Sequence, residues 1–322
     1  GCDFLKNKML YDREVTFKDR AIEFEVRKKL KKMQGPIMFS ETINIYELEV
    51  ISRGTKDLEG IENLVNLERL SLYSNNLNAM TLRHLSGLKH LKSLDLADNP
   101  SIMEIPAGTL DEMTELRELV LDETGIYTLD EIMMEKLINL EEILIEDNNI
   151  KNLNFLRNNK SLKKILFRNN RVSDISAIKD LEKLDEVWGA NNEISSIDAL
   201  ENKRDLEYIN FENNFIEDIS PLKNSYKLET VYLGNNRIAN IDALQDKKLI
   251  KSLELEENRI TNIESLSTLE AVERLYLNKN NIKDFSPIAN LKKLETLFVS
   301  QNQTSNFDVL HEIGLNLRNK DF

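Results

Sequence analysis

Several residue types are scarce in this chain of 322 residues: it has one cysteine, one tryptophan, three histidines, five prolines and ten glycines. Cys2 is the single cysteine, so an intramolecular disulfide and a multi-cysteine metal site are excluded. The few prolines and glycines exclude a low-complexity linker. No apolar run approaches the roughly 18 residues of a membrane span. We therefore expect a folded chain that has no disulfide and does not cross a membrane.

The charge balance is acidic, with 43 Lys and Arg against 56 Asp and Glu and a net charge of −13 at pH 7. An acidic surface repels phosphate backbones, so we expect no nucleic-acid partner. The histidines are His84, His90 and His311, and their spacing is not that of a helical ligand pair. A glycine-rich phosphate loop and an EF-hand pattern are both missing. The sequence predicts a non-enzymatic protein without catalytic residues, cofactor or metal ion.

Internal periodicity is the strongest pattern in the chain. The motif L-x-x-L-x-L-x-x-N-x-I recurs, and its asparagine slot returns every 22 residues in the second half and every 22 to 25 residues in the first. The slot is occupied by Asn75, Asn99, Thr124, Asn148, Asn170, Asn192, Asn214, Asn236, Asn258, Asn280 and Asn302. Eleven consecutive units of this regularity are not a chance occurrence.

Each unit has a direct physical interpretation. The segment L-x-L is a short strand with two inward side chains, and the asparagine ends it. An inward amide can bond backbone groups of its own turn and of the adjacent turn, so stacked asparagines predict a ladder. Thr124 is the one defect, because a hydroxyl has a single donor. No unit can bury its leucines alone, so the units must stack into a curved solenoid with a parallel sheet on its inner face.

These units resemble the leucine-rich repeat family, and the 22-residue repeats with "DISPL" resemble those of bacterial internalin-type proteins. The segment "VTFKDRAIEFEVRKKLKKMQGP" looks like the N-terminal cap of that type. There Thr16 and Asp19 predict a capping box, and Gly35-Pro36 predicts the helix end. Apolar residues recur at helical spacing between them, and a first strand is expected over 46–51. The helical positions are Ile22, Val26, Leu30 and Met33.

The resemblance implies an α/β solenoid: a curved leucine-rich repeat domain with a concave parallel β-sheet, a helical N-terminal cap and short helical or 3-10 segments on the convex side. The expected divisions are a tether over 1–14, the cap over 15–57, repeats over 58–304 and a C-terminal cap over 305–322. In the longer early repeats, "LDEIMMEKLINL" predicts a convex helix.

The dipeptide Gly1-Cys2 resembles the end of a bacterial lipobox, where the cysteine becomes the lipidated first residue. This predicts a lipid anchor on Cys2 as the only link to a membrane, and a place on the bacterial cell surface. An incidental cysteine is the other interpretation, with a secreted or cytoplasmic protein as its consequence.

Trp188 stands in the outward slot of "EVWGANN", since Val187 and Gly189 align with inward positions of neighbouring repeats. The flanking repeats carry Phe167 and Phe211 where this one has Gly189, so we expect both rings to lean into the missing volume. The outward slots should be solvent positions. In order they hold Ser71, Asp95, Val120, Leu144, Leu166, Trp188, Asn210, Tyr232, Glu254, Tyr276 and Phe298.

The outward row predicts a protein-binding surface on the concave face, because a contiguous apolar patch inside a charged rim is typical of interfaces. Val120, Leu144, Leu166 and Trp188 should form an apolar row, with Tyr208 beside it. Lys164 and Arg168 lie between acidic rim residues. The predicted partner-binding residues are Val120, Leu144, Leu166, Trp188, Tyr208, Tyr232, Tyr276, Phe298, Glu142, Glu146, Glu186 and Glu212.

Three hypotheses about function follow. The first is a lipid-anchored surface protein that binds a protein partner through the concave face. The second is a glycan-binding surface module, since Tyr232, Tyr276 and Phe298 could stack on sugar rings. The third is an intracellular adaptor similar to the short-repeat phosphatase regulators.

Overall fold

The computed structural model describes residues 12–322, and its contacts divide the chain into two units. The N-terminal unit ends at Asn149 and the C-terminal unit runs from Ile150 to Phe322. Cys2 and most of the predicted tether lie outside the described residues. Among the described helices, none is both long enough and apolar enough to cross a membrane.

The N-terminal unit begins with a small helical segment. Strand β1 (Glu14–Val15) pairs antiparallel with β2 (Ile37–Met38), and helices α2 (Arg20–Leu30) and α3 (Phe39–Thr42) lie in the same segment. Helix α2 buries Ile22 and Val26, two of the residues at predicted helical spacing.

Both predicted ends of helix α2 are wrong by several residues. The N-cap is Asp19, whose carboxylate accepts hydrogen bonds from Ala21 N at 2.8 Å and Ile22 N at 3.0 Å, so Thr16 does not begin a capping box. The helix ends at Lys31, which adopts a left-handed conformation with φ of 54°. Gly35-Pro36 therefore does not stop the helix, and Met33 lies outside it with 55% of its surface exposed.

Five consecutive parallel strands follow in the N-terminal unit, each paired with the next. They are β3 (Glu47–Glu49), β4 (Arg69–Ser71), β5 (Ser93–Asp95), β6 (Glu118–Val120) and β7 (Glu142–Leu144). The intervening segments form η1 (Ile61–Asn63), η2 (Met80–Leu85) and α4 (Glu131–Glu135). Helix α4 confirms the helix predicted in "LDEIMMEKLINL", and Asp130 caps it by accepting from Met133 N.

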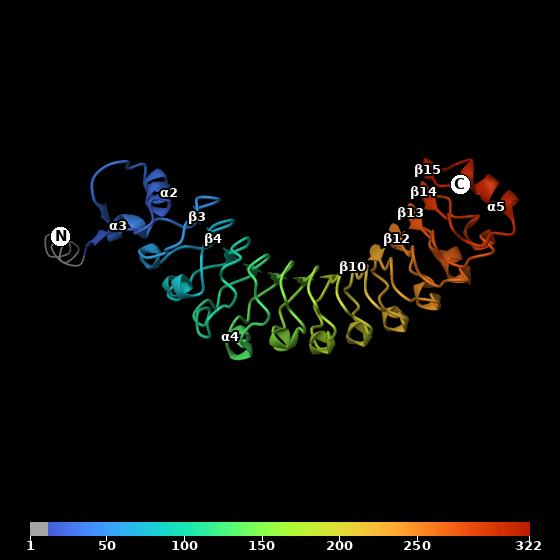
Figure 1. Ribbon diagram of the computed structural model, residues 1–322, viewed down its shortest axis with the longest axis horizontal. Coiled ribbons are helices and arrows are strands. Elements are labelled where there is room, and N and C mark those ends of the chain that lie inside the picture. Colours follow the sequence, from blue (N-terminus) through green and yellow to red (C-terminus); the bar gives the residue numbers. More distant parts are fainter. Residues whose placement is uncertain (1–11) are drawn as a thin grey trace. The chain divides into compact units, whose positions relative to one another are not determined.

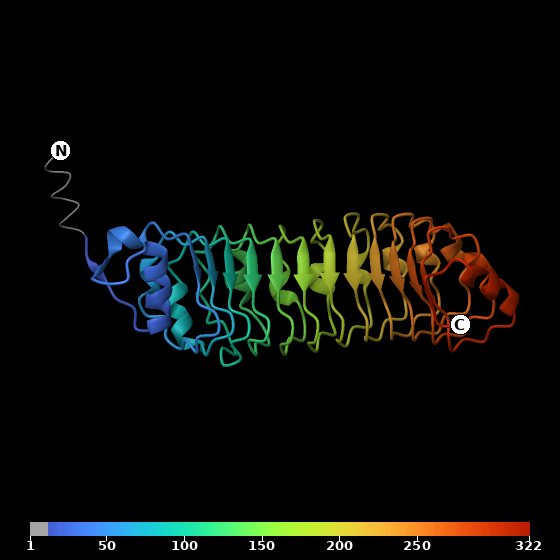
Figure 2. The ribbon, with the colours of Figure 1, turned by 90° about the horizontal axis from the view of Figure 1, so that it is seen from above.

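The C-terminal unit repeats a strand and a 3-10 turn at short intervals, with its strands along one side and its 3-10 helices along the other (Figures 1 and 2). Its parallel strands are β8 (Lys164–Leu166), β9 (Glu186–Trp188), β10 (Tyr208–Asn210), β11 (Thr230–Tyr232), β12 (Ser252–Glu254), β13 (Arg274–Tyr276), β14 (Thr296–Phe298) and β15 (Asn319–Lys320). The turns are η3 (Asn154–Leu156), η4 (Ser176–Ile178), η5 (Asp198–Leu200), η6 (Ser220–Leu222), η7 (Asp242–Leu244), η8 (Glu264–Thr268) and η9 (Ser286–Ile288). Helix α5 (Phe307–Gly314) precedes β15.

The core lies between the strands and the turns, where inward leucines, isoleucines and valines are almost fully buried. Val187 is buried as predicted. A Cβ on Gly189 would lie 2.5 Å from Phe167 Cζ and 3.0 Å from Phe211 Cε1. The two phenyl rings therefore occupy the space that the glycine leaves, which confirms the predicted register of this strand.

The asparagine ladder forms as predicted. Asn214 Nδ2 donates to Phe211 O and Glu212 O of its own turn at 3.0 and 3.2 Å, and to Gly189 O of the preceding repeat at 2.9 Å. Its Oδ1 accepts from Ile194 N at 3.0 Å. The same donor pattern recurs at Asn75, Asn99, Asn148, Asn192, Asn236, Asn258, Asn280 and Asn302.

Thr124 is the ladder's defect. Its hydroxyl donates to Leu121 O at 2.7 Å, within its own turn, and its N–H donates to Asn148 Oδ1 at 3.0 Å. With a single donor, the hydroxyl has none left for the carbonyl of the preceding repeat.

Asn214→Ala should lower the free energy of unfolding by about 1–3 kcal/mol, because the buried Ile194 N–H loses its acceptor and Gly189 O keeps only the bond from Asn192 Nδ2. Denaturant unfolding measures the change. The matched control is Asn224→Ala, which removes an exposed amide whose one partner among the described residues is Asn202, and it should cost less than about 0.5 kcal/mol. Thr124→Asn should be neutral or stabilising. Equal losses for the Asn214 and Asn224 variants would contradict the ladder.

Candidate interaction surface

The outward side chains of the parallel strands form what we call the strand face of each unit. In the N-terminal unit, Ser71, Asp95, Val120 and Leu144 are lateral neighbours in that order. In the C-terminal unit the order is Leu166, Trp188, Asn210, Tyr232, Glu254, Tyr276 and Phe298. Within each unit this is the register that the repeat pattern predicts.

The outward positions are less accessible than predicted. Leu166 and Asn210 are buried, with 9% and 7% of their surface exposed, and the other outward residues are only partly exposed. The expectation that all are solvent positions was wrong for these two residues. Strands in a sheet lie about 4.8 Å apart, so each outward side chain is covered laterally by the next.

Trp188 points outward from β9 and is partly covered there. The Arg168 guanidinium carbon lies 4.9 Å from the centroid of the indole ring, a cation–π arrangement. The indole Nε1 is shielded from solvent and has no hydrogen-bond partner within residues 12–322. A freely accessible indole was expected, whereas the structure shows a half-buried ring with an unused donor.

The charged rim of the strand face is internally paired in several places. Lys164 Nζ lies 3.6 Å from a Glu186 carboxylate oxygen. The Tyr208 hydroxyl donates to Glu229 Oε2 at 3.1 Å. Because these groups already have partners, they contribute less to binding than free charges would.

The acidic end of the N-terminal unit is partly buried. Glu142 is partly exposed, but Glu146 is buried at 8% exposed. Asp122 Oδ1 accepts from Glu146 N at 2.7 Å. Burial, together with the nearby Glu146 and Asp147 carboxylates, raises the pKa of Asp122 to about 6.

The predicted aromatic residues do not form one platform. Tyr276 and Phe298 stack with ring centroids 4.8 Å apart and an interplanar angle of 10°. Glu254 stands between Tyr232 and this pair in the lateral row. Tyr208 lies two residues before Asn210 on β10 and pairs with Thr230, so it belongs to the neighbouring lateral row. The aromatic side chains are thus divided by a carboxylate.

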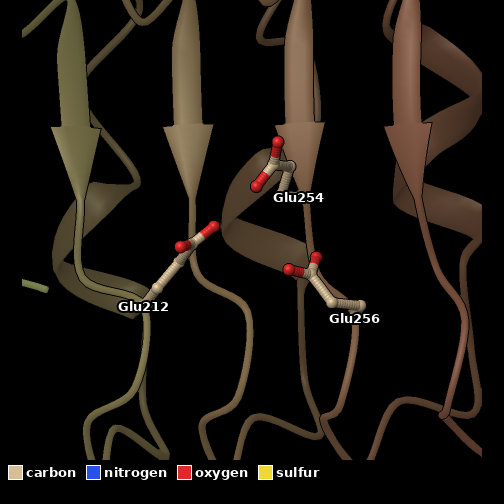
Figure 3. Close-up of side chains that lie close together, drawn as sticks. All are labelled: Glu212, Glu254 and Glu256. Carbon is tan, nitrogen blue, oxygen red and sulfur yellow. The ribbon is translucent and has the colours of Figure 1, made fainter. Parts of the chain in front are cut away.

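That carboxylate belongs to a cluster that the sequence analysis missed. One oxygen each from Glu212, Glu254 and Glu256 lies within 4.8 Å of the others, and Figure 3 shows Glu212 and Glu256 pointing toward each other across the intervening strand. Burial and hydrogen bonding to Glu212 raise the pKa of Glu254 to about 9, and burial raises that of Glu256 to about 7. Such a set can share protons or bind a cation.

The histidines lie apart from this face. In the N-terminal unit, His84 Nδ1 lies 3.3 Å from Glu62 Oε2 and His90 Nδ1 lies 2.8 Å from Glu115 Oε2. Among the described residues, the group of Glu212, Glu254 and Glu256 is the one in which three or more metal-binding side chains converge.

Comparison with known proteins gives matches to leucine-rich repeats. A family model described as Leucine Rich repeats (2 copies) matches residues 270–310. No curated protein matches the chain. The structure of an internalin (inlF) from Listeria monocytogenes is similar with a TM-score of 0.86 and 26% identity, covering 95% of this chain and 96% of that one.

Two further matches, below 25% identity, show the fold alone. A leucine-rich repeat protein from Leptospira interrogans has a TM-score of 0.59 and 19% identity, covering 88% of this chain and 91% of that one. A chain of the mouse RP105/MD-1 complex has a TM-score of 0.70 and 21% identity, covering 88% of this chain and 51% of that chain.

Stability should fall as pH rises from about 5 to about 9. The folded chain holds protons on Glu254 and Glu256 more tightly than the unfolded chain, whose glutamates titrate near 4.5. The stabilisation is therefore complete below that value and is lost as pH rises through about 7 and about 9. Glu212, Glu257 and Arg274 are the neighbouring charged groups. Melting temperature against pH measures the effect.

Glu254→Gln should flatten this pH profile, because the amide cannot ionise. The matched control is Glu257→Gln, at an exposed carboxylate paired with Lys279 at 3.2 Å, and it should keep the wild-type slope. Asp122, whose pKa is also raised, is present in the wild type and in both variants. Its contribution to the pH profile is therefore the same in all three proteins. A Glu254→Gln profile as steep as that of the wild type would contradict the assignment.

Proposed function

Since the chain is an internalin-like leucine-rich repeat protein, we propose that it is a non-enzymatic bacterial cell-surface protein that binds a protein partner through its strand face. The repeat fold supports this, because stacked repeats expose a long row of outward side chains that are not part of the hydrophobic core. A similar chain belongs to the mouse RP105/MD-1 complex, which supports protein binding by this fold. The proposed contacts are the partly exposed residues of the predicted set, without the buried Leu166 and Glu146.

Trp188 is the observation that carries the proposal. Its ring is half-buried, its Nε1 donor has no partner among the described residues, and Arg168 covers it with a cation. Leu166 lies beside it in the same row. Tryptophan and arginine are the residues most enriched at the energetic centres of interfaces.

A protein ligand is favoured over a glycan. Sugar binding would use the faces of Tyr232, Tyr276 and Phe298, yet Tyr276 and Phe298 stack on each other at 4.8 Å. Their facing surfaces are therefore closed to a sugar ring. A protein partner instead needs an apolar centre with a charged rim, which matches the surroundings of Trp188.

Trp188→Ala should weaken partner binding by more than about 2 kcal/mol, the usual threshold of a hot spot. Partners are captured by crosslinking the protein to intact cells and are then titrated by calorimetry. As the only tryptophan, Trp188 also reports directly, and binding should shift its emission to the blue and protect it from a soluble quencher.

The control variant is Phe215→Ala. Phe215 is also an aromatic residue beneath an arginine, with Arg237 4.7 Å from the ring centroid, but it follows the ladder asparagine and lies off the strand rows. It should leave binding unchanged. Unchanged affinity in Trp188→Ala, or an equal loss in Phe215→Ala, would refute the assignment of the strand face.

Surface localisation rests in this proposal on lipidation of Cys2. The full-length protein expressed in its source organism should fractionate with membranes, and Cys2→Ala should release it. One acyl chain alone binds a membrane only marginally, so we expect more than one. Metabolic labelling with a fatty acid checks the modification, and Asp3→Ala is the control that should remain bound. Release of both forms into the soluble fraction would favour a secreted or intracellular protein instead.

A further inference from the structure

Helix α2 contacts β3, the strand at the edge of the sheet in the N-terminal unit, and lies at that end of the unit (Figure 1). It turns Ile22 and Val26 inward, where both are buried. On its other side, four exposed residues follow one another at spacings of four, four and three. Residues three and four apart lie on the same side of a helix. We call these four residues the outer stripe: Arg20, Phe24, Lys28 and Lys31.

The outer stripe is basic in a chain that is acidic as a whole. Residues 20–36 include six basic and two acidic side chains, whereas the net charge of the chain is −13. Lys28 lies 3.4 Å from Glu25, and such an exposed pair is weak. Within the described residues, Arg20 and Lys31 form no ion pair. The stripe therefore presents cations that the fold does not neutralise.

The needs of the fold do not explain this composition. A terminal cap requires a polar outer face, but acidic residues would meet that requirement equally well. The helix dipole favours a cation in the last turn, where Lys28 lies, but disfavours one in the first turn, where Arg20 lies.

Phe24 adds an exposed aromatic ring to the stripe, with 41% of its surface accessible. Two cations flank the ring: Lys28 Nζ lies 5.5 Å from its centroid and the Arg53 guanidinium carbon 5.6 Å. Just beyond the helix, Met33 is 55% exposed. Lysine and arginine together with exposed apolar side chains are typical of surfaces that bind the headgroup region of a membrane.

We propose that the outer stripe of α2 docks on the anionic surface of a phospholipid bilayer. Each lysine or arginine near such a surface strengthens binding about fivefold, and Phe24 can enter the boundary between headgroups and acyl chains. The acidic remainder of the chain is repelled by the same surface, which limits the contact to this end of the N-terminal unit. The proposal rests on the proposed cell-surface location for the presence of a membrane, but not on partner binding at Trp188.

The position of Cys2 favours a bilayer over other anionic partners. Asp12 is the tenth residue after Cys2, and ten residues span at most about 36 Å. The Asp12 carboxylate accepts hydrogen bonds from Ser40 N at 3.0 Å and from the Ser40 hydroxyl at 2.7 Å, which joins this point of the chain to α3 beside α2. A lipid on Cys2 would therefore keep α2 near the bilayer. Stable anchoring combines two signals, such as a lipid and a basic patch.

The full chain carrying Cys2→Ala tests the stripe without any lipid on the protein. It should sediment with vesicles of phosphatidylglycerol and phosphatidylcholine in equal parts, but not with vesicles of phosphatidylcholine alone. Raising the salt concentration from about 0.1 M to about 1 M should release it, because the Debye length falls from about 10 Å to about 3 Å. Adding Trp188→Ala should leave vesicle binding unchanged, so failure of this proposal and failure of partner binding are distinguishable.

Removing the cations of the stripe should weaken binding to the anionic vesicles about a hundredfold, since three charges are lost at about fivefold each. The variant carries Arg20→Gln, Lys28→Gln and Lys31→Gln. Glutamine is a good helix former, so α2 should persist, and an unchanged melting temperature checks this.

The matched control removes three exposed lysines of the C-terminal unit and changes the net charge by the same amount. It carries Lys283→Gln, Lys292→Gln and Lys293→Gln, and it should bind the vesicles as the Cys2→Ala protein does. Equal losses in the two triple variants would show only an effect of net charge and would overturn the proposal.

Two further results would overturn the assignment to a bilayer. The first is a Cys2→Ala protein that fails to sediment with the phosphatidylglycerol vesicles at about 0.1 M salt. The second is tighter binding to soluble inorganic polyphosphate than to the vesicles, which would assign the stripe to a phosphate polymer instead.

Discussion

The inward-turned asparagine amide is the interaction on which each unit depends. A short strand of three residues cannot hold its neighbours by sheet hydrogen bonds alone, and the turn that follows leaves carbonyls pointing inward. Asn214 Nδ2 satisfies carbonyls of two successive repeats while its Oδ1 accepts the Ile194 N–H. Because the amide bonds both its own repeat and the preceding one, it sets the register of successive strands together with the buried leucines.

A register maintained in this way turns residues 22 positions apart into lateral neighbours. Two glycines show what this does in the C-terminal unit. Gly189 faces the core, and Phe167 and Phe211 close over it, so its effect is on packing. Gly234 faces outward in the row of Glu212 and Glu256, and the Glu256 carboxylate occupies the space above it. The lack of a Cβ thus allows two phenyl rings to pack at Gly189, and it allows a carboxylate to approach another at Gly234.

The strand face therefore combines two kinds of chemistry. Around Trp188, a partly exposed indole ring beside the Arg168 guanidinium suits a protein ligand. Around Glu254, three carboxylates converge, and burial raises the pKa of Glu254 and that of Glu256.

The sequence by itself determined the repeat, the strand register within each unit, the ladder and its defect at Thr124, the convex helix α4 and the outward direction of Trp188. These follow from periodicity, because inward and outward positions alternate along a strand. Only the tertiary structure decided the ends of helix α2, where the local choice between Thr16 and Asp19 as the cap depends on packing. The tertiary structure also decided that Leu166 and Asn210 are buried and that the Arg168 guanidinium lies over the Trp188 ring. It likewise brought the carboxylates of Glu212 and Glu256 close together. These depend on how side chains from separate strands lean across about 5 to 10 Å of sheet, which no pattern along a single strand records.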